Sequence, residues 1–254
     1  MKTKLKFIDL FAGLGGIRLG FEQACQERGI ETECVLTSEI KPYAVQTLKH
    51  NHHHENFVGD IFQVKNEDIP PFDFLFGGFP CQPFSASGKR NGFADTRGTL
   101  FFEIERIIKY HQPKGFILEN VEGLVKHDLE DKNDEIGRTL KTILDKLENE
   151  LDYQVTWKVL DSVHFGVPQS RKRIFIVGTK NEKVSLDNFE PTFKVLKDIL
   201  ETGKPTMNTD FTKKLLSHFS VEELYGKSIK DKRGGENNIH SWDIGIKGEC
   251  TKDQ

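Results

Sequence analysis

The chain has 254 residues, 36% of them hydrophobic and 30% charged, which is an ordinary soluble composition with room for one large α/β domain and part of a second. No apolar run reaches membrane-spanning length, the amino terminus lacks the apolar core of a signal peptide, and four cysteines without a C-x-x-C pair argue against a disulfide framework and indicate a reducing compartment. The net charge of −3 does not indicate nucleic-acid binding, although local basic clusters can still provide it.

The first predicted unit is a strand, a glycine-rich turn and a helix. The strand covers residues 5–10, the turn has the sequence FAGLGG at 11–16, and apolar positions between Ile17 and Cys25 share one face of the helix. This arrangement suits a nucleotide-like cofactor, because glycines let the backbone approach a ligand and the helix amino terminus offers free N–H groups. Arg18 stands where G-x-G-x-x-G has its third glycine, so a generic glycine turn is the alternative.

Two acidic residues follow the next two predicted strands. Glu39 comes after the strand at 33–37, and its distance from Gly15 is near the roughly 20 residues expected for an acid that binds ribose hydroxyls. Asp60 follows the short apolar pair at 57–58, and its carboxylate can accept a hydrogen bond from an exocyclic amine such as that of adenine. The alternative for Asp60 is a helix or turn cap, which is the commoner use of aspartate.

A histidine run lies at the end of the helix that is predicted to begin at Pro42. Histidine is a common metal ligand, but no acid or cysteine stands at ligand spacing from the run at 50–54. We therefore predict a solvated helix end there and no metal site, with a structural metal site as the alternative.

A strand predicted at 72–78 leads into the central stretch of the chain. It is short and apolar, and it ends in a double glycine, where the backbone can turn tightly or approach a ligand. Cys81 follows in a loop that is stiffened by a proline on each side. The loop should present a thiol at the carboxyl end of a strand, which is where ligands bind in open α/β sheets. The alternative is a small buried cysteine in a proline turn.

The segment at 84–98 is long, rich in glycine and serine, and basic, because it contains three basic residues and one acid. A loop of this length in a compact domain usually has a function or is disordered. Its charge suits a lid that closes over a phosphate backbone, and a merely solvated loop is the alternative.

A second candidate for chemistry follows the buried strand predicted at 115–118. A helix with an apolar stripe, capped by Thr99, precedes this strand, and Glu119 stands directly after it. Because the carboxyl ends of parallel strands lie at the same edge of a sheet, Glu119 and Cys81 should come together.

Two arginines precede the last strand predicted for the main domain. After a helix at 140–151 and a strand at 155–159, a basic turn places Arg171 and Arg173 just before a strand at 174–177. Residues at i and i+2 of an extended chain point to the same side, so the two guanidinium groups can converge on one anion.

Taken together, these motifs resemble those of the cytosine-5 DNA methyltransferases of bacterial restriction–modification systems, over about residues 5–178. The resemblance rests on FAGLGG at 11–16, Glu39, GDI at 59–61, GFPCQPFS at 78–85, ENV at 119–121 and QSRKR at 169–173, in the family's order and spacing. It implies a Rossmann-like α/β domain with a mostly parallel sheet, S-adenosylmethionine as cofactor with S-adenosylhomocysteine as its product, double-stranded DNA as substrate, and a cytoplasmic protein of bacterial or phage origin.

The resemblance also implies roles for individual residues. The cofactor site would be lined by Phe11, Gly13, Leu14, Gly15, Glu39, Ile40, Asp60, Ile61 and Leu100. The flipped cytosine would be served by Cys81, Glu119, Arg171 and Arg173. The basic loop would contact DNA through Ser85, Ser87, Lys89, Arg90 and Arg97.

Methylation at C5 of cytosine explains why these residue types are needed. A Cys81 thiolate that adds to C6 turns the ring into an enamine, and C5 can then attack a sulfonium methyl group. Glu119 can hydrogen-bond or protonate N3 and so stabilise the developing charge, while the arginines hold the base and the loop. The target base must leave the duplex stack, and the sequence does not identify the base that removes the C5 proton.

The carboxyl-terminal part departs from the family pattern. From residue 181 onward the periodicity weakens, so we divide the chain into a catalytic domain at 1–180 and a hinge with an incomplete target-recognition region at 181–254. Residues 241–248 resemble the opening of a recognition domain, and we find no equivalent of the family's later segments. We therefore expect a split or truncated enzyme with weak or no activity until a second polypeptide supplies the rest.

Three other functions are compatible with parts of the sequence. A dehydrogenase could hold NAD with the glycine turn and Glu39, although the loosened glycine pattern and the pair of Cys81 and Glu119 argue against it. A non-catalytic nucleic-acid-binding subunit of the same fold would not need both reactive side chains. The same chemistry on a tRNA cytosine would use the same motifs.

Overall fold

The structure is a computed structural model that describes residues 4–52, 56–79, 100–131 and 133–195, together with short stretches at 198–199, 213, 217–218, 220, 228–231 and 240–243. The chain forms two compact units, Met1–Phe193 and Lys194–Gln254. The predicted cap at Thr99 lies outside the described residues. Within the described part, no helix is both long enough and apolar enough to cross a membrane.

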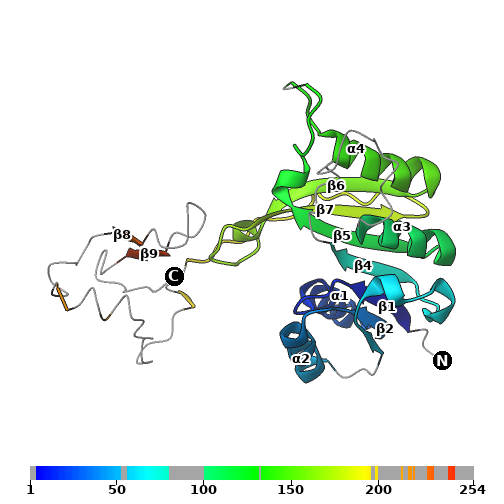
Figure 1. The fold of residues 1–254 in the computed structure, drawn as a ribbon, viewed down its shortest axis with the longest axis horizontal. Coiled ribbons are helices and arrows are strands. Elements are labelled where there is room, and N and C mark those ends of the chain that lie inside the picture. Colours follow the sequence, from blue (N-terminus) through cyan, green and yellow to red (C-terminus); the bar gives the residue numbers. More distant parts are fainter. Residues whose placement is uncertain are drawn as a thin grey trace. The chain divides into compact units, whose positions relative to one another are not determined.

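A seven-stranded sheet organises the first unit. Figure 1 shows its strands between the helices. Its strands are β1 Leu5–Leu10, β2 Thr32–Ser38, β3 Phe57–Val58, β4 Phe74–Gly78, β5 Gly115–Val121, β6 Gln154–Asp161 and β7 Lys172–Thr179. They lie in the order β3-β2-β1-β4-β5-β7-β6, and β7 alone is antiparallel to its neighbours β5 and β6. The prediction of a mostly parallel sheet is therefore confirmed.

Helices cover both faces of this sheet. The α-helices are α1 Gly16–Glu27, α2 Pro42–Asn51, α3 Leu100–His111 and α4 Arg138–Asp145. Shorter turns are η1 Ile61–Gln63, η2 Asn66–Asp68, η4 Glu122–Leu124 and η6 Ser162–His164, and a π-turn, η5 Lys146–Glu150, continues α4. The predicted start of α2 at Pro42 and the strand and helix order along the first unit agree with these bounds.

Alternation along the central strands sends apolar side chains to two separate cores. On one face, Phe21 of α1 packs against Phe7, Phe74 and Phe76, with ring centroids 4.7 to 5.6 Å apart. On the other face, α3 and α4 pack with the opposite side of the strands in a larger cluster that includes Ile8. Burial of these side chains from water, at about 25 cal/mol per Å² of apolar surface, is the main force that assembles the layers.

A glycine permits the close approach of β5 and β7. Phe116 of β5 lies opposite Gly178 of β7, and a β-carbon on Gly178 would lie 2.1 Å from the Phe116 ring. Any side chain at position 178 would therefore displace a buried aromatic ring. This contact helps to hold β7 beside β5, and β7 begins at the arginine-rich segment.

The strand order reverses between β1 and β4, and this reversal is the natural ligand-binding position of an open α/β sheet. β1 ends at Leu10 and β4 ends at Gly78. A β-carbon on Gly78 would lie 3.8 Å from the carbonyl oxygen of Phe11, so the two strand ends meet there. The predicted glycine turn and the predicted cysteine loop both leave the sheet at this point.

The second unit contains an antiparallel hairpin of β8 Ser228–Asp231 and β9 His240–Asp243. β9 overlaps the start of the segment 241–248, whose sequence resembles the opening of a recognition domain, and residues 244–248 lie outside the described residues.

Candidate active site

The glycine turn after β1 has the backbone geometry that only a few residue types adopt readily. Phe11, Gly13 and Gly15 have φ angles of 56°, 57° and 80°. Glycine takes such angles without strain, whereas Phe11 adopts them at a cost. A β-carbon on Gly15 would also lie 2.8 Å from His52 Nε2, so both conformation and space require glycine there.

Glu39 fixes this turn from the neighbouring strand end. Its carboxylate is largely buried, Oε2 accepts a hydrogen bond from the Gly13 N–H at 2.8 Å, and Oε1 accepts one from the Lys41 N–H at 2.9 Å. The turn is also tied to β2 by the Ala12 N–H, which donates to the Ser38 carbonyl at 3.1 Å. The structure therefore brings together Gly13 and Glu39, as the sequence predicted, through a direct contact that spacing alone did not predict.

Large apolar side chains are exposed at the same edge. Leu14 is 63% exposed, Ile40 is 68% exposed, and Tyr43 in the first turn of α2 is 65% exposed. Leu14 and Ile40 were predicted to line the cofactor site, and Tyr43 was not. Apolar side chains at a strand edge beside a glycine turn can contact the flat ring of a ligand.

Asp60 caps the short turn η1. Its Oδ1 accepts a hydrogen bond from the Phe62 N–H at 3.0 Å, so the commoner, capping use of aspartate is present here. Ile61 is buried in the main core, and Leu100 opens α3 and packs against the same core. Recognition of an amine by Asp60 stays a prediction.

The second group of predicted residues meets beside the end of β4. Glu119 pairs in register with Gly78, and its Oε1 lies 2.9 Å from Arg173 Nε. Both side chains are only about one-fifth exposed (23% for Glu119 and 22% for Arg173). The other carboxylate oxygen, Oε2, would be 3.6 Å from a β-carbon on Gly78. The ion pair thus sits at the carboxyl edge of the sheet, close to where the cysteine loop begins.

Glu119 lies inside β5, not after its end as the sequence predicted. β5 continues to Val121 because its residues 119–121 pair with residues 173–175 of antiparallel β7. The same pairing explains how a residue more than 50 positions later in the chain reaches Glu119. The prediction that Glu119 marks the sheet edge still holds, since β4 ends at the level of Glu119.

Arg171 is held differently from Arg173. Its N–H donates to Asp161 Oδ1 at 2.9 Å and its carbonyl accepts from the Ser162 N–H at 3.3 Å, in the loop just before β7. Among residues 100–131 and 133–195, its guanidinium forms no ion pair. The structure therefore brings only Arg173 to Glu119, and the convergence of both guanidinium groups on one anion stays a prediction.

Two residues that the sequence analysis missed organise this edge. Asn120 is buried, and its side-chain amide donates to the Phe79 carbonyl at 3.0 Å, which anchors the chain where it leaves β4. Asp161 accepts hydrogen bonds from Ser170 Oγ at 2.7 Å and from the Arg171 N–H, and the bond from Ser170 lowers the pKa of its carboxyl group. Asn120 stands in the ENV motif at 119–121, where no role was assigned to it, and Asp161 carried only the signal of a polar residue at the end of an apolar strand.

The predicted nucleophile and the basic loop lie outside the described residues. These positions are Cys81, Ser85, Ser87, Lys89, Arg90 and Arg97. Of the other cysteines, Cys25 and Cys34 are buried. Burial raises the pKa of both thiols, for Cys34 to about 11. Thiols in such surroundings are poor nucleophiles at neutral pH, so neither competes for the role given to Cys81.

A buried charged cluster that the sequence did not reveal lies behind the glycine turn. Asp9 and Arg18 are both more than nine-tenths buried, and Arg18 Nε donates to Glu22 Oε1 at 2.8 Å. Asp9 Oδ2 and Arg18 Nη1 have no hydrogen-bond partner among the described atoms. Burial raises the pKa of Asp9 to about 7, against the opposing effect of the Arg18 charge.

The histidine run at 50–54 is described only as far as His52. His52 is buried, and its Nδ1 lies 3.8 Å from Glu22 Oε2, while burial lowers the pKa of its imidazole. Residues 53–55 are not among those described. Within the described ranges, no three His, Cys, Asp or Glu side chains are placed to hold a metal ion.

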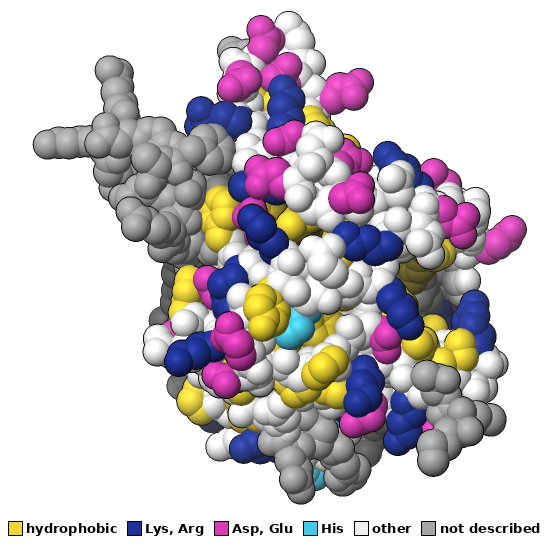
Figure 2. Space-filling model, turned by 90° about the vertical axis from the view of Figure 1, so that its right-hand side faces the viewer, with side chains coloured by type: hydrophobic (Ala, Val, Ile, Leu, Met, Phe, Trp, Pro, Cys, Tyr) yellow, Lys and Arg dark blue, Asp and Glu magenta, His cyan; other side chains and the backbone are white. Residues whose placement is uncertain are grey.

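The surface charge is mixed on the face that Figure 2 displays. Lys and Arg side chains there are interspersed with Asp and Glu among the described residues, and small apolar areas lie between them. That face therefore carries no broad field of one sign, as the overall charge of −3 suggests.

Comparisons with known proteins agree with this geometry. The sequence pattern of the family described as C-5 cytosine-specific DNA methylase matches residues 5–245. Among curated proteins, Type II methyltransferase M.NgoBV of Neisseria gonorrhoeae is 57% identical over 251 residues, which are 99% of this chain and 59% of that protein. Type II methyltransferase M.NlaIV of Neisseria lactamica is 57% identical over 252 residues, with the same two coverages.

A solved structure shares the fold at much lower identity. The Dnmt2 methyltransferase of S. pombe superposes with a TM-score of 0.63 at 20% identity, over 85% of this chain and 67% of that one. The present chain spans about three fifths of the length of its two Neisseria relatives. From the family pattern across most of its length and from its identity to these relatives, the chain belongs to the C-5 cytosine-specific DNA methylase family.

Proposed function

We propose that this chain catalyses methyl transfer from S-adenosylmethionine to C5 of a cytosine that has been flipped out of duplex DNA. The observation that carries the proposal is the ion pair between Glu119 and Arg173 beside Gly78. Gly78 ends β4, and Cys81 follows closely in the sequence. A carboxyl group held by a guanidinium next to a cysteine loop suits attack at C6 with assistance at N3.

The residues at the glycine turn fit the cofactor. Each carboxylate oxygen of Glu39 accepts one backbone N–H, and each has a further lone pair that can accept from a ribose hydroxyl. The exposed apolar side chains of Leu14 and Ile40 can pack on an adenine ring. The bound cofactor supplies an electrophilic methyl group, and the positive φ angles of Gly13 and Gly15 let the backbone lie close to it.

In this proposal the side chains near the end of β4 have different roles in the reaction of the cytosine. The Cys81 thiolate forms a bond to C6, and Glu119 donates a hydrogen bond or a proton at N3 as negative charge develops in the ring. Arg173 holds Glu119 in place through the contact at 2.9 Å. After C5 has gained the methyl group, loss of the C5 proton reforms the C5–C6 double bond and expels the thiolate.

In the same proposal Arg171 serves the flipped cytosine. The basic loop contacts the DNA backbone, which cationic and hydroxyl side chains suit, through Ser85, Ser87, Lys89, Arg90 and Arg97. Residues 1–180 would supply catalysis, and residues 181–254 the hinge and part of target recognition. A second polypeptide stays a prediction, as does a location in the bacterial cytoplasm.

The test is the identity of the methylated product. The purified chain, alone and with a candidate second polypeptide, is incubated with labelled S-adenosylmethionine and either genomic DNA or bulk tRNA, and the digested nucleosides are separated. We expect labelled 5-methylcytosine from DNA only. Label on another atom, or in tRNA but not in DNA, would contradict the proposal, and full activity of the chain alone would contradict the need for a partner.

A further inference from the structure

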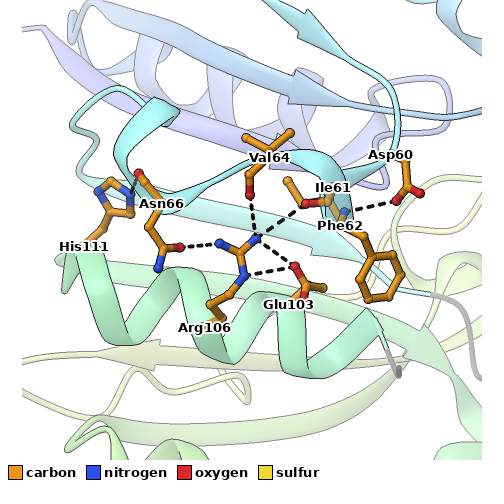
Figure 3. A network of polar contacts seen from close by, with 8 residues as sticks. All are labelled: Asp60, Ile61, Phe62, Val64, Asn66, Glu103, Arg106 and His111. Carbon is orange, nitrogen blue, oxygen red and sulfur yellow. Dashed lines mark hydrogen bonds and ion pairs between the residues drawn. The ribbon is translucent and has the colours of Figure 1, made fainter. Parts of the chain in front are cut away.

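Arg106 connects α3 to the segment that carries Asp60 and Ile61, as Figure 3 shows. Its Nη2 donates to the carbonyl of Val64 at 3.0 Å and to that of Ile61 at 3.5 Å, and its Nη1 donates to the side-chain oxygen of Asn66. One guanidinium therefore binds η1 at Ile61, the residue after η1 at Val64 and the start of η2 at Asn66. The sequence analysis assigned no role to Arg106.

The guanidinium is aimed by a second contact on its own helix. Glu103 Oε2 accepts from Arg106 Nε at 3.0 Å and from Nη2 at 2.7 Å, and both side chains are mostly buried. Arginine suits this place because its planar group offers five N–H donors in fixed directions, which lysine cannot match. A lysine would keep the charge toward Glu103 but could not reach the two backbone carbonyls and Asn66 together.

The segment that Arg106 holds has little structure of its own. η1 and η2 are three residues each, and turns this short do not hold their shape without outside contacts. The far end of the segment is fixed in the same way, because the Asn66 carbonyl accepts from His111 Nε2 at 3.0 Å. Burial lowers the pKa of His111, against the opposing effect of its contact with the Asn66 carbonyl.

The position of the Asp60 carboxylate depends on η1. Oδ1 is held by the Phe62 N–H at 3.0 Å, so the direction of Oδ2 follows from how the turn at Ile61 and Phe62 is placed. Oδ2 is the oxygen that we expect to meet the 6-amino group of adenine. A shift of η1 would move this oxygen without changing Glu39 or the glycine turn, which are held by their own contacts.

We propose that Arg106 is a positioning residue that sets the selectivity of the cofactor site for the 6-amino group of adenine, by fixing η1 from α3. This inference rests on the proposed function, because it assumes that the site binds an adenosyl cofactor. It differs from a purely structural role in one measurable respect. Loss of Arg106 lowers affinity for the adenosyl ligand and leaves affinity for a ligand without the amine nearly unchanged.

The experiment measures binding of two ligands to the full chain by calorimetry. One is S-adenosylhomocysteine, and the other is its analogue with hydrogen in place of the 6-amino group. For the unaltered chain we expect roughly tenfold or greater preference for the adenosyl ligand, since a site built to accept an N–H discriminates against its absence. Arg106→Met should reduce the preference to about twofold or less, and Arg106→Lys should give an intermediate value.

Controls separate this effect from damage to the fold. Arg138→Met removes a helix arginine that pairs with Asp128 at 2.9 Å, and it should leave the preference unchanged. If Arg106→Met does not fold, the same preference is measured for Arg106→Lys and Asn66→Ala, and both variants should lower it. An unchanged preference in the folded variants, or an equal loss of affinity for both ligands, would overturn the inference. Failure of the unaltered chain to bind either ligand would instead overturn the proposed function.

Discussion

Two parts of the carboxyl edge of the sheet, here called the cofactor edge and the base edge, are held together in different ways. The cofactor edge, which comprises Phe11–Gly15 and Glu39, is fixed by a buried carboxylate that accepts two backbone N–H groups. The base edge, which comprises Gly78, Glu119 and Arg173, is fixed by one ion pair between two partly exposed side chains. A carboxylate bonded to backbone shapes a site, whereas a carboxylate bonded to a movable side chain can exchange that partner for a substrate.

The difference implies that substitutions at the two edges should have separable effects on turnover and on cofactor binding. Changes at the base edge should lower turnover and leave cofactor binding intact. Changes at the cofactor edge should lower cofactor affinity and stability, and turnover at saturating cofactor should largely survive. Variants of Glu119, Arg173 and Glu39 test this separation, and a variant of Asp9 tests the buried charge behind the glycine turn.

Glu119→Gln should have the largest effect. The amide cannot donate a proton to N3 and loses its charge toward Arg173, so we expect turnover to fall by about 100-fold or more, in the range typical of general acids. Affinity for S-adenosylhomocysteine should stay within about twofold. The exposed neighbour Glu122, which lies 3.8 Å from Lys172, gives the matched control Glu122→Gln. A comparable loss in that control would show that charge alone is being measured.

Arg173→Lys should follow, with turnover lower by roughly tenfold or more. Lysine retains the charge but has no planar fork to orient Glu119, so the position of the carboxyl group should loosen. Arg173→Met should be worse than Arg173→Lys. Steady-state kinetics at saturating cofactor measures both variants. Equal turnover for the unaltered chain and Arg173→Met would show that Arg173 has no part in catalysis.

Glu39→Gln should act on the other edge. A glutamine oxygen can accept from one of the two backbone N–H groups, while its amide nitrogen cannot accept from the other. A buried donor left unpaired costs about 1–3 kcal/mol, so the free energy of unfolding should fall by that order and S-adenosylhomocysteine should bind roughly tenfold more weakly. Denaturant unfolding and calorimetry check the two effects. A large loss of turnover at saturating cofactor would break the separation of the edges.

Asp9→Asn should have the smallest effect on turnover, and its effect on stability should depend on pH. Folding raises the pKa of Asp9 from 3.8 to about 7, so the folded state binds the extra proton and the free energy of unfolding falls as pH rises toward 7. The scale is about 1.4 kcal/mol for each pKa unit. Asp9→Asn should reduce this slope, as measured by denaturant unfolding at several pH values. An unchanged slope in Asp9→Asn would contradict this role of Asp9. Asp187→Asn, at an exposed aspartate, is the control and should leave the slope as it is.

Much of the fold could be predicted because its signals are local. The strand from Leu5 to Leu10, the glycine turn and the helix start at Pro42 follow from apolar periodicity and from the backbone preferences of glycine and proline. Placing Glu119 at the sheet edge needed only the rule that parallel strands end together. The arrangement of the two edges therefore followed from the order of strands along the chain.

The features that were missed depend on partners far away in the sequence. Arg106 contacts Asn66 and Asn120 contacts Phe79, each about 40 residues distant, and no spacing rule connects such pairs. β5 extends past Glu119 because an antiparallel strand arrives from later in the chain. The burial of Asp9 beside Arg18 likewise arises only when α1 packs on the sheet.

The most direct test of the central claim is the site of covalent attachment to DNA. The chain, under conditions in which it methylates DNA, is incubated with S-adenosylmethionine and duplex DNA containing 5-fluorocytosine, which blocks loss of the substituent at C5. The adduct is then digested with trypsin and mapped by mass spectrometry. We predict that the nucleotide is attached to the peptide containing Cys81. Attachment at Cys25 or Cys34, or methylation of ordinary DNA without any adduct on the fluorinated duplex, would contradict the account.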